Sequence, residues 1–115
     1  MVSLFRNKVV IVTGASSGFG EAISIKFASQ GAKVVLCGRD RSRLNSVYDK
    51  VVKVSGGHED MFLAIEGDLN EHAVRKEIID KTIAKFGRLD ILVANAGVTS
   101  SKQALLYCSE ETYDE

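Results

Sequence analysis

A glycine-rich turn between a short apolar run and a helical pattern constrains this chain more than any other feature. Residues 13–20 read TGASSGFG and follow the run VVIV at residues 9–12, while Ile23 and Phe27 behind them are spaced as on one helix face. Glycines let the backbone turn sharply and approach a ligand closely, and the free N–H groups of a helix start favour negative charge. This arrangement is typical of a loop that holds the pyrophosphate of a dinucleotide, although such a motif taken alone is more often an ordinary turn.

Strand-sized apolar runs alternate with helical patterns along the rest of the chain. The expected strands are residues 8–13, 33–37, 61–65 and 89–94, and the expected helices include residues 17–30 and 69–86. Between the second and third strands, apolar residues at helical spacing predict another helix, formed around Leu44, Val47, Tyr48, Val51 and Val54. The last helix should bury a stripe made of Val74, Ile78, Ile79, Ile83 and Phe86. Such alternation implies right-handed crossovers, so we expect an α/β fold with a doubly wound parallel sheet of the Rossmann type, in the strand order 3-2-1-4.

Length and charge limit the class of protein. The 115 residues suffice for one domain, residues 1–115, and the 15 basic and 15 acidic residues cancel. A neutral balance offers no general attraction for nucleic acid or an anionic membrane. The apolar runs are too short to cross a bilayer and no charged leader precedes a long apolar stretch, so we expect a cytoplasmic protein, with an organelle left open. His58 and His72 lack metal-ligand spacing, so no metal site is expected, and Cys37 in an apolar run indicates a buried thiol.

Three further segments fit the same fold as the glycine turn. They are GRD at residues 38–40, GDL at residues 67–69 and NAG at residues 95–97. Together with residues 13–20, in this order, they resemble the cofactor-binding half of the short-chain dehydrogenase/reductase family. The resemblance covers nearly the whole chain and implies a partial dinucleotide-binding domain, incomplete at its C-terminus. It also implies a longer enzyme, since members of the family usually run to roughly twice this length, the size of a full doubly wound domain.

The resemblance also implies which residues bind the cofactor. The glycine turn would contribute Gly14, Ser16, Ser17, Gly18, Phe19 and Gly20. Asp68 and Leu69 would lie at the adenine ring, where a carboxylate can accept a hydrogen bond from the exocyclic amine. Helix-cap preferences leave open that Asp68 only caps the third helix.

The segment at residues 95–97 closes the fourth strand at its carboxyl end, outside which ligands of open α/β sheets bind. By the same resemblance, Asn95 supports the centre of the sheet, and Ala96 and Gly97 pass close to the cofactor. A glycine at a strand end can equally be a plain turn residue, so Gly97 keeps that alternative.

The end of the second strand bears on the choice of cofactor. In NAD-using relatives an acidic residue there binds the ribose 2′-hydroxyl, but here Gly38 holds that place and Arg39 follows it. A guanidinium can bind a 2′-phosphate that a carboxylate would repel, so we expect NADP(H) rather than NAD(H). Three points speak against this expectation and stay open. Asp40 can reach the ribose unless it caps the second helix, and Arg39 can be a solvated surface charge. Many NADP-users also have a basic residue where this chain has Ser17.

The residues that perform the family's chemistry are not found in this sequence. The family uses a serine, a Tyr-x-x-x-Lys pair and an asparagine, with the tyrosine as general acid and base. Four residues after Tyr48 and Tyr107 stand Val52 and Glu111, and Tyr113 has no residue at that spacing. The whole enzyme would transfer hydride between a nicotinamide and a carbonyl or alcohol substrate, as a homodimer or tetramer. The alternative for the chain as printed is a non-catalytic nucleotide-binding or interaction module.

The fourth strand is expected to lie at an open edge of the sheet. After Val98 the pattern weakens, and only residues 109–111 indicate the start of a further helix. Residues 91–93 would then have no partner on one side and little cover on one face. Exposed edges and apolar patches promote association, so we expect the chain by itself to be marginally stable and to self-associate.

Overall fold

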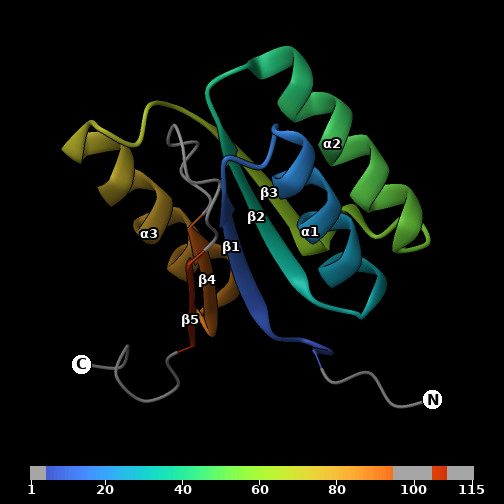
Figure 1. Ribbon diagram of the computed structural model, residues 1–115. Coiled ribbons are helices and arrows are strands. Elements are labelled where there is room, and N and C mark those ends of the chain that lie inside the picture. Colours follow the sequence, from blue (N-terminus) through green and yellow to red (C-terminus); the bar gives the residue numbers. More distant parts are fainter. Residues whose placement is uncertain (1–4, 95–104, 109–115) are drawn as a thin grey trace.

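Strands and helices alternate in the computed structural model, which describes residues 5–94 and 105–108 (Figure 1). The strands are β1 (Val9–Thr13), β2 (Lys33–Gly38), β3 (Phe62–Glu66), β4 (Ile91–Ala94) and β5 (Leu105–Cys108). The helices are α1 (Gly18–Ser29), α2 (Arg41–Val54) and α3 (His72–Phe86), and a short 3-10 turn, η1 (Glu59–Met61), precedes β3. Among these residues, no helix combines the length and the apolar character needed to span a bilayer.

One sheet holds the described strands in the order β3-β2-β1-β4-β5. β1 pairs in parallel with β2 and with β4, and β2 pairs in parallel with β3. The predicted parallel sheet in the order 3-2-1-4 is therefore confirmed. α1 and α2 cover one face of this sheet, and α3 lies on the other face (Figure 1).

The outer edge of β4 is paired, which the sequence did not predict. β5 runs antiparallel to β4, with Ile91 opposite Cys108 and Ala94 opposite Leu105. The expectation of an unpaired edge at residues 91–93 is therefore wrong. An antiparallel partner needs only a short return of the chain, whereas a further parallel strand needs a crossover of a dozen or more residues. The helix start expected at residues 109–111 lies outside the described residues.

Side chains of β1 alternate between the two faces of the sheet. Val10 and Val12 belong to the core under α1 and α2, whereas Val9 and Ile11 belong to the core under α3. All four side chains are at most 1% exposed. A strand that is buried on both faces needs apolar residues at every position, which explains the continuous run VVIV.

The helices depart in detail from the predicted apolar stripes. α3 begins at His72 rather than at residue 69. Thr82 is fully buried and its hydroxyl donates a 2.7 Å hydrogen bond to the carbonyl of Ile78, whereas Ile83 is 42% exposed. A hydroxyl that bonds to the preceding helical turn can be buried, so Thr82 takes the core position that the sequence indicated for Ile83. Val54, the last residue of α2, is likewise exposed rather than part of its buried stripe.

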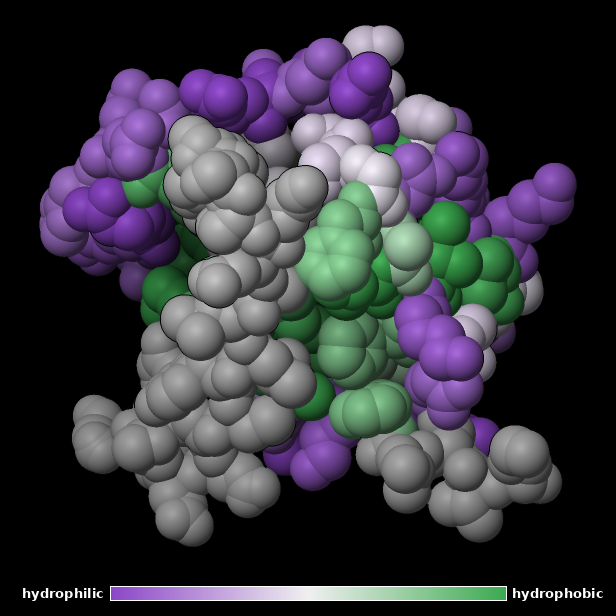
Figure 2. All heavy atoms as spheres, in the orientation of Figure 1, coloured by the Kyte–Doolittle hydropathy of each residue, from purple (hydrophilic) through white to green (hydrophobic). Residues whose placement is uncertain are grey.

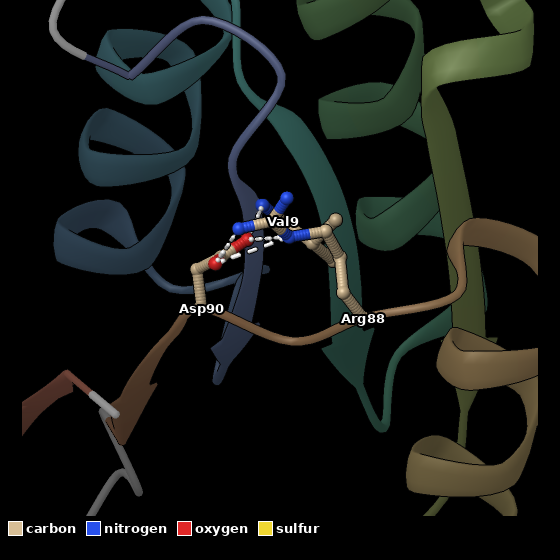
Figure 3. A network of polar contacts seen from close by, with 3 residues as sticks. All are labelled: Val9, Arg88 and Asp90. Carbon is tan, nitrogen blue, oxygen red and sulfur yellow. Dashed lines mark hydrogen bonds and ion pairs between the residues drawn. The ribbon is translucent and has the colours of Figure 1, made fainter. Parts of the chain in front are cut away.

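A buried carboxylate joins β1 to the segment before β4 (Figure 3). Asp90 is 7% exposed, and its Oδ2 accepts a 2.8 Å hydrogen bond from the N–H of Val9. The N–H of Asp90 donates in return to the carbonyl of Val9 at 3.0 Å. Arg88 donates to both carboxylate oxygens, from Nη2 at 2.6 Å and from Nε at 2.9 Å. These bonds hold the amino end of β1 in register beside β4.

The environment of Asp90 favours its charged form. Burial acts to raise the pKa of this carboxyl, but the hydrogen bonds from Arg88 and from the N–H of Val9, with the charges of Arg88 and Lys8, outweigh burial and lower it. A carboxyl whose pKa is lower in the folded protein stabilises the fold above its unfolded pKa. That contribution is lost as the pH falls through the folded pKa.

We predict that Asp90→Ala lowers the free energy of unfolding by about 1–3 kcal/mol, because it leaves the buried N–H of Val9 without an acceptor. Asp90→Asn should cost less, because its amide oxygen can still accept that bond. Urea unfolding at several pH values measures both effects. Below about pH 4 the native protein should lose stability more steeply than Asp90→Asn.

The matched control is Asp80→Ala, which breaks an exposed ion pair between Asp80 and Lys76 on α3. Exposed pairs of this kind contribute about 0.3–0.5 kcal/mol. Equal losses in Asp90→Ala and Asp80→Ala would show that the buried carboxylate does not hold β1 and β4 together.

Candidate dinucleotide-binding site

The parallel register brings three loops together at the carboxyl ends of the strands. Thr13 at the end of β1 lies opposite Cys37, and Gly38 at the end of β2 lies opposite Glu66. The strand pairing continues into the loops, because the N–H of Ala15 donates to the carbonyl of Cys37 at 2.9 Å. In the same way, the N–H of residue 67 donates to the carbonyl of Gly38 at 2.9 Å. The loops after β1, β2 and β3 therefore lie side by side.

These loops surround an open hollow of about 1040 Å³. Three of the four sequence segments that resemble the dehydrogenase family meet here. The hollow is lined by Gly14, Ser16, Ser17, Cys37, Gly38, Arg39, Asp40, Arg41, Arg43, Gly67, Asp68, Leu69 and Asn70. Figure 2 shows hydrophilic residues gathered at the top of the molecule, over the start of α2, and hydrophobic residues below them over α1.

The glycine turn is held by its own short contacts. Gly14 has a φ of 66°, in the left-handed region that glycine adopts without strain. Ser17 caps α1, because its Oγ accepts a 3.1 Å hydrogen bond from the N–H of Gly20 and donates at 2.9 Å to the carbonyl of Gly14. A Cβ on Gly20 would lie 2.0 Å from that same carbonyl oxygen. Gly20 is therefore required by the packing of the loop on the helix.

Gly18 differs from Gly20, because the described part of the chain leaves space beside it. A Cβ built on Gly18 meets no atom of the described residues within 4 Å. The next residue, Phe19, is 52% exposed although it is a large apolar side chain. Both residues lie in the first turn of α1, directly after Ser17 at the hollow.

Three arginines at the start of α2 differ in their partners. The side chain of Arg39 makes no hydrogen bond or ion pair with any residue of the described ranges 5–94 and 105–108. Arg41 donates from Nε to Oε1 of Glu66 at 3.0 Å. Arg43 lies with its Nε 3.9 Å from Oδ2 of Asp40.

Asp40 caps α2, as the sequence indicated. Its Oδ1 accepts a 3.2 Å hydrogen bond from the N–H of Arg43, and its other oxygen faces the Arg43 guanidinium. This carboxylate is therefore engaged by α2 itself. The alternative in which Asp40 turns toward a ribose would require both contacts to break.

Asp68 does not cap α3, so that alternative is wrong. The residue before α3 is Glu71, and its side chain makes no capping bond. Asp68 instead closes a tight turn, because its Oδ1 accepts a 2.9 Å hydrogen bond from the N–H of Asn70. The turn delays the start of α3 and leaves Asp68 and Leu69 on the wall of the hollow.

Asn95, Ala96 and Gly97 lie outside the described residues. Arg41 and Arg43 also line the hollow, and no sequence motif singled them out, although they follow Arg39 at two-residue intervals. Arginines at the start of a helix carry no periodic signal that separates them from solvated surface charges.

Cys37 lines the hollow with a buried side chain. Burial raises the pKa of the Cys37 thiol to about 12, so it stays protonated and unreactive at neutral pH. Within the described part of the chain, no three His, Cys, Asp or Glu side chains come together as metal ligands.

Known proteins resemble this chain in sequence and in fold. A family profile described as short chain dehydrogenase matches residues 8–115. Glucose 1-dehydrogenase of Gluconobacter oxydans is 43% identical over 93 residues, which are 81% of this chain and 34% of that protein.

Two solved structures are similar as well. L-sorbose reductase from Gluconobacter frateurii, complexed with NADPH and L-sorbose, has a TM-score of 0.77 at 33% identity, over 87% of this chain and 37% of that one. A 3-ketoacyl-(acyl-carrier-protein) reductase from Brucella melitensis, complexed with NADH, has a TM-score of 0.71 at 38% identity, over 81% and 35%.

The chain spans about a third of the length of the relatives it matches. Within that third, the family profile extends over the strands, the helices and the loops that form the hollow. The chain belongs to the short-chain dehydrogenase family.

Proposed function

We propose that this chain is the NADP(H)-binding part of an oxidoreductase that transfers hydride between the nicotinamide and a carbonyl or alcohol substrate. The observation that carries the choice of NADP(H) is the Arg39 guanidinium at the rim of the hollow, beside Gly38. In a site for NAD, an acidic side chain would stand where Gly38 is. A 2′-phosphate would supply an anion for Arg39, which has no acidic partner in the part of the chain that the structure describes.

The shape of the glycine turn suits a pyrophosphate. The open space beside Gly18 is what a phosphate needs in order to approach the backbone, since any side chain there would fill it. Gly14, Ser16 and Gly18 would hold the pyrophosphate, and Asp68 with Leu69 would contact the adenine. When bound, the cofactor supplies the hydride chemistry. The residues of this chain bind and orient it.

The engagement of Asp40 by α2 supports NADP(H) over NAD(H). Asp40 accepts from the N–H of Arg43 and its other oxygen faces the Arg43 guanidinium, so turning this carboxylate toward a ribose 2′-hydroxyl would weaken the cap of α2. A Cβ on Gly38 would lie 3.0 Å from Oγ of Ser16, so an acidic residue could enter here only if Ser16 moved. Relatives of this chain have been solved with NADPH and with NADH, so binding measurements must decide between them.

A second candidate function is a nucleotide-binding module without catalysis. The observation behind it is that neither Tyr48 nor Tyr107 is followed four residues later by lysine. A longer transcript that encodes a Tyr-x-x-x-Lys pair would decide for the enzyme. For the enzyme we further propose a small-molecule substrate, a homodimer or tetramer, and a cytoplasmic location.

We predict that Arg39→Ala weakens NADPH binding about ten-fold or more, because a hydrogen bond to a charged group contributes about 1.5–3 kcal/mol. NADH binding should change little, since NADH has no 2′-phosphate. Isothermal titration of both cofactors measures the two affinities, with Arg6→Ala as an exposed arginine control before β1. Equal weakening of NADPH and NADH by Arg39→Ala would contradict the assignment.

We predict that alanine lowers the stability of the fold at Gly20 but lowers the affinity for the cofactor at Gly18. Gly20→Ala should destabilise the fold by about 1–3 kcal/mol, because the new methyl group overlaps the carbonyl of Gly14. Gly18→Ala should keep the native unfolding temperature but lose most of its cofactor affinity, because the methyl group occupies space needed only by the pyrophosphate. Thermal unfolding and NADPH titration separate the two effects. Native NADPH affinity in Gly18→Ala would rule out a pyrophosphate at this turn.

A further inference from the structure

The ion pair between Arg41 and Glu66 connects two walls of the hollow. Arg41 is the first residue of α2, and Glu66 is the last residue of β3, 25 positions later. The hydrogen bond between them is 3.0 Å long and uses Nε of the guanidinium. Since Arg41 also lines the hollow, this contact fixes a cation at its rim before any ligand arrives.

The contact occupies only part of the guanidinium. Arginine has five N–H donors in a planar fork, and Nε carries one of them. The terminal nitrogens of Arg41 can therefore donate to an anion in the hollow while Nε stays with Glu66. A side chain that is already held loses less conformational freedom on binding than one that is free.

The other two arginines of this segment are placed differently. Arg39 has no protein partner in the described ranges, so it must be ordered by the ligand itself. Arg43 pairs with Asp40 inside the first turn of α2, and that pair connects no second element. Among the described residues, Arg41 is the one of the three that is bonded to a second element, the strand that leads into Asp68 and Leu69.

We infer that Arg41, positioned by Glu66, is a second ligand of the 2′-phosphate and shares with Arg39 the discrimination of NADP(H) from NAD(H). The inference rests on the proposed function. A phosphate monoester carries about −1.5 to −2 charges near neutral pH, more than one guanidinium balances. Glu66 acts through Arg41 and is a positioning residue. Its carboxylate is 41% exposed, so contact with water reduces its repulsion of the phosphate without removing it.

The test compares two probes that differ in the 2′-phosphate alone, adenosine 2′,5′-bisphosphate and 5′-AMP, by isothermal titration of the full chain. Arg41→Ala should lower the affinity for the bisphosphate about five-fold, as for the loss of one charge-assisted hydrogen bond at an exposed site. Its affinity for 5′-AMP should stay unchanged. Arg41→Lys should show most of the same five-fold loss of affinity for the bisphosphate. One ammonium cannot hold the carboxylate and the phosphate through separate fixed nitrogens.

The positioning role of Glu66 is tested by a double-mutant cycle. Glu66→Gln should lower bisphosphate affinity in the native background and have no effect in the Arg41→Ala background. The controls are Arg6→Ala, away from the hollow, and Glu77→Gln, which breaks an exposed pair with Lys81 on α3. Both controls should leave the ratio of the two affinities unchanged.

Failure of this inference is distinguishable from failure of the proposed function. If Arg39→Ala abolishes the preference for the bisphosphate but Arg41→Ala does not reduce it, Arg41 is no phosphate ligand and the NADP(H) proposal stands. If Glu66→Gln raises bisphosphate affinity, the ion pair holds Arg41 away from the phosphate and the inference is overturned. If the native chain shows no preference between the two probes, both proposals fail.

Discussion

The register of three parallel strands is the constraint on which the rest of this structure depends. Thr13 lies opposite Cys37, and Gly38 lies opposite Glu66, so the three strands end at one edge. The backbone bonds of the sheet continue one step beyond the strands, from Ala15 to the carbonyl of Cys37. Loops separated by more than twenty residues in the sequence thereby become neighbours. A slip in the register would separate the glycine turn from the arginines and would turn every β1 side chain to the other face.

The central strand, β1, is held at both of its ends by hydrogen bonds of buried polar groups. At the amino end, Asp90 accepts from the N–H of Val9, and Arg88 satisfies the remaining carboxylate positions. At the carboxyl end, the hydroxyl of Thr13 donates to the carbonyl of Val93 at 3.3 Å. A buried polar group without a partner would be costly, so these bonds disfavour any other alignment of β1 and β4. The position of the glycine turn relative to the sheet follows from that alignment.

The charges around the hollow have distinct roles because their partners differ. Asp40 and Arg43 serve the start of α2, and Asp68 closes the turn before α3. Arg39 is left without a protein partner within the described ranges. Three arginines and two aspartates line the hollow, so its net charge attracts an anion only weakly. Local pairing instead leaves donors available at particular atoms, and these atoms decide which phosphate groups can be recognised.

The sequence by itself determined what depends on near neighbours and on periodicity: the four parallel strands, the glycine turn and the cap at Asp40. These features follow from local backbone preferences and from apolar spacing. Only the tertiary structure decided that β5 covers β4, that Thr82 rather than Ile83 is buried, and that Asp68 makes a turn instead of a cap. It also decided that Arg41 is held by Glu66, whereas Arg39 has no partner among the residues that the structure describes. Such outcomes depend on contacts between distant residues, as in the pair of Arg41 and Glu66, and a local pattern contains no information about a partner that folding alone brings near.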